Sequence, residues 1–198
     1  MIFSDQTIIN KMGERITPFE KKQVRRRDDG DGEKMRIVSY GLSSSGYDVR
    51  LARELKVQRI GGRRNPKEKF IDPKRGARAW EEVDTTGEDF VTIRPGECIL
   101  GVTVEHVDMP DDVMALCIGK STYARCGLLV NATPIEAGWR GHITLELSNT
   151  GRLPIRVYLE EGIAQLVFLQ IDQRPNVTYN DRGGKYQDQT DSPIPAVI

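Results

Sequence analysis

The chain has 198 residues, 38% of them hydrophobic, which is enough for one ordinary domain with a proper core. Lysine plus arginine and aspartate plus glutamate both number 29, so no overall charge favours nucleic acid or an anionic membrane. No apolar run approaches the roughly 18–20 residues that cross a bilayer, and residues 1–12 do not read as a signal peptide. We therefore predict a single domain over residues 1–198, cytoplasmic, with neither a nucleic acid nor a membrane as partner.

The cysteines and histidines do not form a pattern typical of a metal site. Cys98, Cys117 and Cys126 are odd in number and include no Cys-x-x-Cys pair, so we expect reduced, mostly buried thiols. The two histidines, His106 and His142, lie far from any thiol pair, and the zinc deaminase pattern of His-x-Glu with Pro-Cys-x-x-Cys is absent. The sequence therefore predicts no zinc.

The N-terminal region reads as one helix followed by charged chain. Residues 4–12 begin with a good N-cap residue, Ser4, carry an acid in the first turn and have apolar residues at helical spacing, which predicts a short helix ending near Gly13. Residues 21–34 mix arginines, aspartates and glycines that cannot bury themselves. We interpret residues 1–36 as an N-terminal helix and a mobile charged loop.

The next region contains a strand and a second loop. Residues 37–51 read as a turn rich in serine and glycine that leads into an alternating strand, with apolar side chains on one face and Asp48 and Arg50 on the other. These two charged residues could form ion pairs, within the chain or between subunits, or could contact a ligand. Residues 59–87 are basic and rich in glycine and proline, which predicts a long exposed loop.

The second half of the chain is a succession of strands. Alternating patterns cover residues 98–104, 142–148 and 155–160, and residues 163–171 are apolar on both faces except for Gln165. Turn signals recur between them at the spacing of sandwiches and barrels, which predicts an all-β, jelly-roll-like domain. Gln165 needs a hydrogen-bond partner, either the backbone or the edge of a base.

Residues 119–125 gather cations and hydroxyls at a loop. Gly119 can turn sharply, Ser121 can cap a short helix, and Arg125 would fall on the same helical face as Ser121. A helix N-terminus supplied with Lys120 and Thr122 is suited to binding phosphate. An ordinary capped surface helix is the alternative, and the Gly-x-x-x-x-Gly-Lys-Ser/Thr phosphate loop is not satisfied.

Glu146 lies on the polar side of the strand predicted over residues 142–148. If that side lines a closed cleft, the carboxylate is partly desolvated, which raises its pKa toward the range useful for proton transfer. A solvent-facing strand is the alternative. In the polar tail, Tyr179 and Tyr186 favour ordering over a ligand, whereas composition alone also allows a disordered end.

Several stretches together resemble one known family, the dCTP deaminases, in the same order along nearly the whole chain. Residues 25–34 and 59–87 depart from that family's pattern. The stretches that carry the resemblance are residues 39–41 (SYG), 45–50 (SGYDVR), 119–127 (GKSTYARCG), 133–136 (TPIE), 141–146 (GHITLE), 161–165 (EGIAQ) and 182–187 (RGGKYQ).

The resemblance implies a zinc-free hydrolytic deaminase of the dUTPase-like superfamily. Its fold would be all-β, a distorted jelly-roll-like β-barrel with a few short helices, assembled as a homotrimer with active sites between subunits. Its reaction would convert dCTP to dUTP and ammonia for pyrimidine deoxynucleotide synthesis. The tail, residues 176–198, would close over the nucleotide, and a Mg²⁺ ion would be held by the triphosphate.

The resemblance also implies roles for individual residues. Glu146 would move protons between water and the pyrimidine, while Ser121 and Arg125 would position the water and stabilise the tetrahedral centre. The residues expected to contact the nucleotide are Lys120, Ser121, Thr122, Tyr123, Ala124, Arg125, Ala132, Thr133, Glu136, Thr144, Leu145, Gln165, Tyr179, Lys185 and Gln189.

Two alternative functions remain open at this point. A bifunctional deaminase and dUTPase would release dUMP and pyrophosphate, with Glu136 as the base for the second reaction, although residues 182–186 do not match the glycine–serine–threonine phosphate loop of dUTPases. A trimeric nucleotide sensor would bind without turnover.

Overall fold

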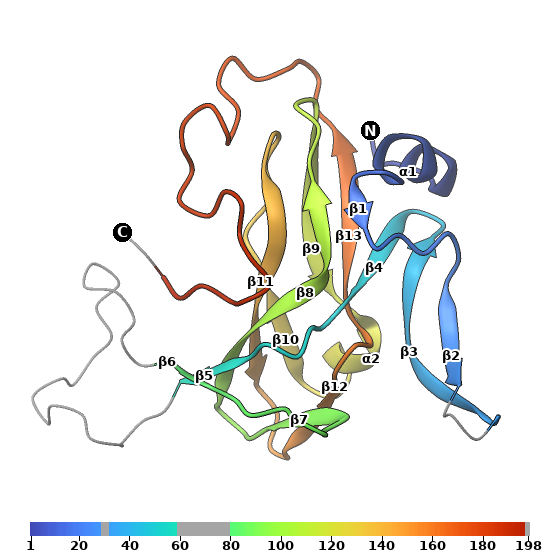
Figure 1. The fold of residues 1–198 in the computed structure, drawn as a ribbon, viewed down its shortest axis with the longest axis vertical. Helices are drawn as coiled ribbons and strands as arrows, with labels where there is room; N and C mark the ends of the chain where they lie inside the picture. The colour runs from blue at the N-terminus through green and yellow to red at the C-terminus, as the bar shows by residue number, and fades with distance from the viewer. Residues whose placement is uncertain (29–31, 59–79, 197–198) are drawn as a thin grey trace, which may run out of the picture.

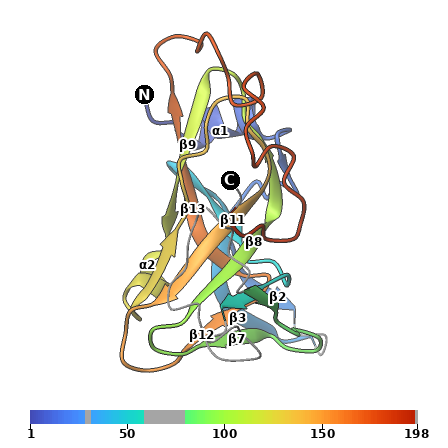
Figure 2. The ribbon, with the colours of Figure 1, turned by 90° about the vertical axis from the view of Figure 1, so that its left-hand side faces the viewer.

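The computed structural model describes residues 1–28, 32–58 and 80–196. Within them the chain is mainly β-structure with two short helices (Figures 1 and 2). The strands predicted over residues 98–104, 142–148, 155–160 and 163–171 are confirmed. None of the helices in this part of the chain is long and apolar enough to cross a membrane.

The strands form three sheets in the described residues, and every pairing is antiparallel. One sheet has the order β10 (Leu128–Asn131), β11 (Arg140–Asn149), β8 (Cys98–Asp108), β5 (Lys56–Gln58) and β6 (Trp80–Glu82), with β1 (Ile16–Thr17) also paired to β8. A second has the order β2 (Val24–Asp28), β3 (Lys34–Ser43), β4 (Gly46–Arg50), β13 (Gly162–Gln170) and β9 (Val113–Gly119). The third pairs β12 (Ile155–Tyr158) with β7 (Phe90–Ile93).

The two large sheets share one apolar core. Leu145 and Leu147 of β11 pack in the same cluster as Leu166 and Phe168 of β13, and all four side chains are fully buried. Burial of this apolar surface is the main force that holds the sheets together. The all-β prediction is confirmed as a mainly β fold, but within the described residues the strands do not close into one barrel.

The N-terminal helix forms as the sequence predicts. Helix α1 spans Asp5–Met12, with Ser4 at the N-cap, where its hydroxyl accepts a hydrogen bond from the Thr7 backbone N–H. The helix ends at Gly13, and Ile8 and Met12 bury the apolar face completely.

Two segments predicted as loops contain strands. The charged segment 21–34 includes strand β2, which pairs with β3 and brings Arg26 opposite Arg36. The hairpin stands at one edge of the molecule (Figure 1), so backbone hydrogen bonds can form while the charged side chains stay in solvent. The prediction of a mobile loop was therefore wrong for residues 24–28. In the predicted loop 59–87, residues 80–82 form β6, and residues 59–79 lie outside the described part.

Candidate active site

A cavity of about 930 Å³ opens beside the polar face of β11. Strand β8 supplies Cys98 and Leu100 to its wall, and the loop between β10 and β11 supplies residues 132–136. The C-terminal tail closes another side with Tyr179 and Tyr186, running along β11 in both views (Figures 1 and 2). This volume and this mixed lining suit a small polar ligand with an aromatic part.

Glu146 faces this cavity because of the alternation of β11. Leu145 and Leu147 point into the core, whereas Thr144 and Glu146 line the cavity and are half-buried. Burial raises the pKa of Glu146 from its ordinary value, and a hydrogen bond of 3.0 Å from Asn131 Nδ2 to Glu146 Oε2 opposes that rise. Of the two alternatives for this strand, a polar side that lines a cleft and a side that faces solvent, the structure shows the first.

The cavity gathers about half of the residues expected to contact a ligand. Gln189 donates a hydrogen bond from Nε2 to the Thr144 hydroxyl, and Glu136 forms an ion pair with Arg182 of the tail. The predicted site residues that line this one cavity are Ala132, Thr133, Glu136, Thr144, Glu146, Tyr179 and Gln189.

The predicted anion cradle lies outside the cavity. Helix α2 spans Ser121–Ala124, and its N-cap is Lys120 rather than Ser121, because the chain is still extended at Lys120. Gly119 ends β9 without a left-handed turn; its missing side chain instead admits Val130, since a Cβ there would lie 3.1 Å from the Val130 Cβ. The prediction of a Ser121 cap was therefore wrong.

The side chains of the cradle fall into two groups. Ser121, Thr122, Ala124 and Arg125 are exposed, and none of them lines the cavity that holds Glu146. Tyr123 instead is buried, and its hydroxyl accepts a hydrogen bond of 3.0 Å from the backbone N–H of Tyr158.

Lys120 and Gln165 belong to a buried polar network. Asp48 accepts hydrogen bonds from Lys120 Nζ and, at 3.0 Å, from Gln165 Nε2. Gln165 also donates to the Ser43 hydroxyl at 3.1 Å, so its partners are side chains and not the backbone. Lys120 Nζ also donates to the Ser39 hydroxyl at 3.4 Å, so a phosphate would share the ammonium group with these two partners.

Two further expected contacts also lie outside the cavity. Leu145 is fully buried in the core, so only its backbone could meet a ligand. Lys185 is exposed in the tail.

All three thiols are free. Cys126 is exposed, so the prediction of mostly buried thiols was wrong for this residue.

Arg50 is paired within the chain. Its Nε and backbone N–H both donate, at 2.8 Å, to the carboxylate of Glu105, which is completely buried on β8. Together with the pair of Asp48 and Lys120, this contact confirms intrachain ion pairing for both charged residues of β4.

Sequence reasoning missed two residues of the site: Trp139, which lines the cavity, and Asn131, which contacts Glu146. Trp139 donates from its indole N–H to the Tyr186 carbonyl at 2.8 Å, and the Tyr186 N–H donates to the Tyr179 hydroxyl at 3.0 Å, so the tail is tied over the site. The Gly-Trp-Arg-Gly sequence around Trp139 was the available signal. Asn131 had none, because its position depends on the pairing of two strands.

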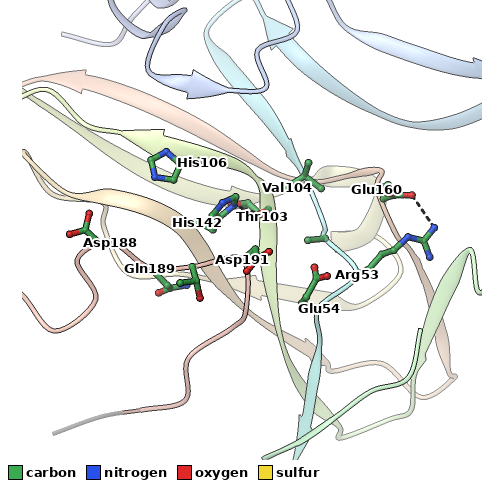
Figure 3. Close-up of a pocket in the computed structure, with 12 residues that line it drawn as sticks. Arg53, Glu54, Thr103, Val104, His106, His142, Glu160, Asp188, Gln189 and Asp191 are labelled. Carbon is green, nitrogen blue, oxygen red and sulfur yellow. Dashed lines mark hydrogen bonds and ion pairs between the residues drawn. The ribbon is translucent and has the colours of Figure 1, made fainter. Parts of the chain in front are cut away.

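A second cavity of about 590 Å³, whose lining residues are drawn in Figure 3, shares Gln189 with the first. His106 and His142 stand edge to face in it with ring centroids 5.4 Å apart, and His142 Nδ1 donates to the Thr103 carbonyl. Burial, and then the neighbouring His142, lower the pKa of His106. Of the predicted site residues only Gln189 lines this cavity.

A half-buried carboxylate with a raised pKa in a cavity of ligand size is what proton transfer to a small molecule requires. The fold and the site therefore define a mainly β protein with a cavity suited to a small molecule and, in Glu146, a candidate group for proton transfer.

The comparisons with known proteins agree on one family. The family model described as dCTP deaminase-like matches residues 2–171. The dCTP deaminase of Pseudomonas paraeruginosa is 46% identical over 181 residues, covering 91% of this chain and 89% of that protein. The dCTP deaminase of Chromohalobacter salexigens is 46% identical over 190 residues, covering 94% and 95%. The chain therefore belongs to the dCTP deaminase-like family.

One solved structure supports the fold. The crystal structure of 2'-deoxycytidine 5'-triphosphate deaminase from Agrobacterium tumefaciens matches with a TM-score of 0.57 at 20% identity. The match covers 84% of this chain but only 46% of that one, so the matched part of this chain spans less than half the length of that relative.

Proposed function

We propose that the protein hydrolyses dCTP to dUTP and ammonia. Membership of the dCTP deaminase-like family gives the reaction its class, and the relatives that match most of the chain carry that name. The observation that carries the proposal is Glu146, a half-buried carboxylate whose pKa is raised by burial and which lines a cavity of about 930 Å³.

Glu146 accounts for the proton transfers of this reaction. The carboxylate takes a proton from water as the water oxygen bonds to C4 of the pyrimidine, and it delivers that proton to the ring. The tetrahedral centre then collapses to a carbonyl, the bond from C4 to the amino nitrogen breaks, and ammonia leaves with the second proton of the attacking water. Because the carboxylate itself activates the water, the mechanism assigns no role to zinc.

Ser121 and Arg125 complete the site from a neighbouring copy of the chain. They are exposed and outside the Glu146 cavity, so they reach a bound nucleotide only across an interface. There they position the water and stabilise the charge of the tetrahedral centre. The assembly that we propose is a homotrimer.

An apolar surface supports such an interface. Leu116 and Ile118 on β9 and Leu129 on β10 are 36%, 53% and 55% exposed, and the two strands contact each other. We call these three residues the β9–β10 patch. It adjoins the Ser121 turn, so packing it against another copy would carry Ser121 and Arg125 to that copy.

The remaining contacts divide between the base and the triphosphate. Backbone groups near Ala132 and Thr133 suit the base and sugar, and Thr144 and Glu136 line the same space. Across the interface, the turn at residues 120–125 suits phosphate oxygens. From the tail, residues 179–189 close over the triphosphate with Tyr179, Lys185 and Gln189.

A Mg²⁺ ion fits this site as a companion of the nucleotide. Among the described residues, no three His, Cys, Asp or Glu side chains gather to hold a metal ion. Mg²⁺ prefers oxygen ligands and keeps several waters, so we propose that it would be held mainly by the phosphate oxygens of the nucleotide. When bound, the ion would neutralise part of the triphosphate charge. A zinc-selective chelator should leave activity unchanged, and EDTA should reduce it until Mg²⁺ is restored.

One assay tests the function. The protein is incubated with dCTP and Mg²⁺, and ammonia, dUTP, dUMP and pyrophosphate are followed together. Equal amounts of ammonia and dUTP support the proposal. Appearance of dUMP with pyrophosphate would assign a second, dUTPase activity, and nucleotide binding without any product would assign a sensor.

A further inference from the structure

Asn131 and Glu146 meet across two paired strands. Asn131 is the last residue of β10, and the antiparallel register places it directly opposite Glu146 of β11. Its side-chain Nδ2 donates to Glu146 Oε2 at 3.0 Å. Both strands are held in place by the core, because Val130 and Leu147, the neighbouring pair in the register, are buried.

This contact affects the ionisation of the Glu146 carboxylate, on which the proposed reaction depends. The carboxylate must be ionised to accept a proton from water, but burial favours its neutral form. A donor that is aimed at one carboxylate oxygen favours the ionised form and fixes the orientation of the group. A carboxylate has about four lone-pair sites, so the hydrogen bonds from Asn131 and from the backbone of Glu146 itself still leave sites for water.

We propose that Asn131 is a positioning residue for the deamination: its amide group donates to Oε2 of Glu146 and holds the carboxylate at the angle from which it meets the water. The inference rests on the proposed function. Asn131 acts through Glu146 and has no contact of its own with the reacting atoms.

The other titratable groups around Glu146 leave this role to Asn131. On β9, burial and then the negative charge of Glu146 raise the pKa of Cys117 to about 12. This thiol therefore stays neutral across the working pH range. From β8, Cys98 lines the cavity, and from the loop Glu136 does so while paired with Arg182. From the tail, Tyr179 and Tyr186 line it. Within one chain, burial, Asn131 and the backbone of Glu146 itself are the influences that set the pKa of this group.

Two substitutions separate the donor from the shape of the side chain. Asn131→Ala removes the amide, and Asn131→Asp keeps the shape but replaces the donor with a second negative charge. In both variants the acid limb of the kcat/KM profile should move to higher pH, by at least about half a unit for Asn131→Ala and by more for Asn131→Asp. Asn131→Gln, which keeps an amide, should recover part of the loss.

Ser148→Ala serves as the matched control. Ser148 lies two residues further along the same face of β11, opposite Leu129, and does not line the cavity. Its pH profile should match the wild type. Acid limbs that coincide in the wild type, Asn131→Ala and Asn131→Asp would overturn the inference. Equal shifts in Ser148→Ala would also overturn it, because they would reveal a general effect of the strand.

A second measurement needs no turnover. The side-chain carboxyl carbon of Glu146 can be titrated by NMR in the ¹³C-labelled free protein, with Glu146→Gln identifying its signal. Removal of Asn131 should raise the measured pKa, and an unchanged pKa would overturn the inference even if the enzyme is active. If the wild type produces no ammonia, the proposed function fails, while the titration still decides whether Asn131 controls this carboxylate.

Discussion

Asp48 and Lys120 form an ion pair in which the two side chains keep only 2% and 12% of their exposure. Gln23 and Gln165 donate to the same carboxylate, at 2.9 and 3.0 Å. The pair ties β4 to the residue that begins the Ser121 turn, and so it links the fold to the proposed anion cradle.

Asp48→Asn should destabilise the protein strongly, because it leaves the ammonium group of Lys120 buried without a counter-charge. We expect a loss of about 3–5 kcal/mol in the free energy of unfolding, measured with urea. The double variant Asp48→Asn with Lys120→Met should recover most of that loss. Asp108→Asn, which breaks the exposed pair with Arg15, provides the control and should change little. A small loss in Asp48→Asn would show that the pair contributes little to stability.

Glu146→Gln should bind dCTP nearly as tightly as the wild type and lose turnover by about 10²–10⁴-fold, because the amide cannot accept the proton of water. Calorimetry measures the binding, and single-turnover release of ammonia measures the reaction. Glu136→Gln, which removes the other carboxylate of the cavity, should reduce deamination far less. Near-normal turnover in Glu146→Gln would remove Glu146 as the proton carrier.

The same substitution should also change how stability depends on pH. Burial raises the folded-state pKa of Glu146 above its ordinary value of 4.5, so ionising this group costs folding free energy. Glu146→Gln removes that cost. Its gain in the free energy of unfolding should be complete above the folded pKa and should fade as the pH falls toward 4.5, where both states become protonated. Urea titrations at a series of pH values measure the difference, and a gain that grows toward low pH would contradict the sign.

Ile118→Asp should break the proposed assembly. Ile118 is 53% exposed in the β9–β10 patch, and a carboxylate buried in an interface there would be strongly unfavourable. We expect monomers by sedimentation and loss of most deaminase activity. Leu153→Asp changes a leucine that is 77% exposed outside the patch, so it should leave both properties intact. A fully active Ile118→Asp trimer would exclude this patch as the interface.

Trp139→Phe should loosen the tail. It removes the indole donor to the Tyr186 carbonyl, a hydrogen bond of 2.8 Å that is worth about 0.5–1.5 kcal/mol. The KM for dCTP should rise about 2- to 10-fold, and proteolysis of the tail should become faster. Tyr158→Phe, a change on β12 outside the cavity, is the control. If the tail resists protease equally in both variants, the indole contact does not hold it.

The charge pattern of residues 21–34 led to a wrong prediction, because backbone hydrogen bonds between strands decide the structure of that segment. Arginines and aspartates in residues 21–34 indicated a loop, yet strand β2 forms there because the adjacent β3 supplies its hydrogen-bond partners. For Gln165, the sequence could show that a partner was needed, but Ser43 and Asp48 are brought to it only by the pairing of β13 with β4.

The sequence by itself determined the local features. Helix α1 followed from its cap and its apolar spacing, and the strand of Glu146 followed from alternation, because these depend only on neighbouring residues. The resemblance to a family likewise rested on residues that the chain carries in order.

Only the tertiary structure decided which of these features meet. It closed the tail over Glu146, placed Asn131 opposite that carboxylate and left Ser121 and Arg125 outside the cavity. Strand register and sheet packing join residues that are far apart in the chain, and no local pattern of side chains specifies those distances.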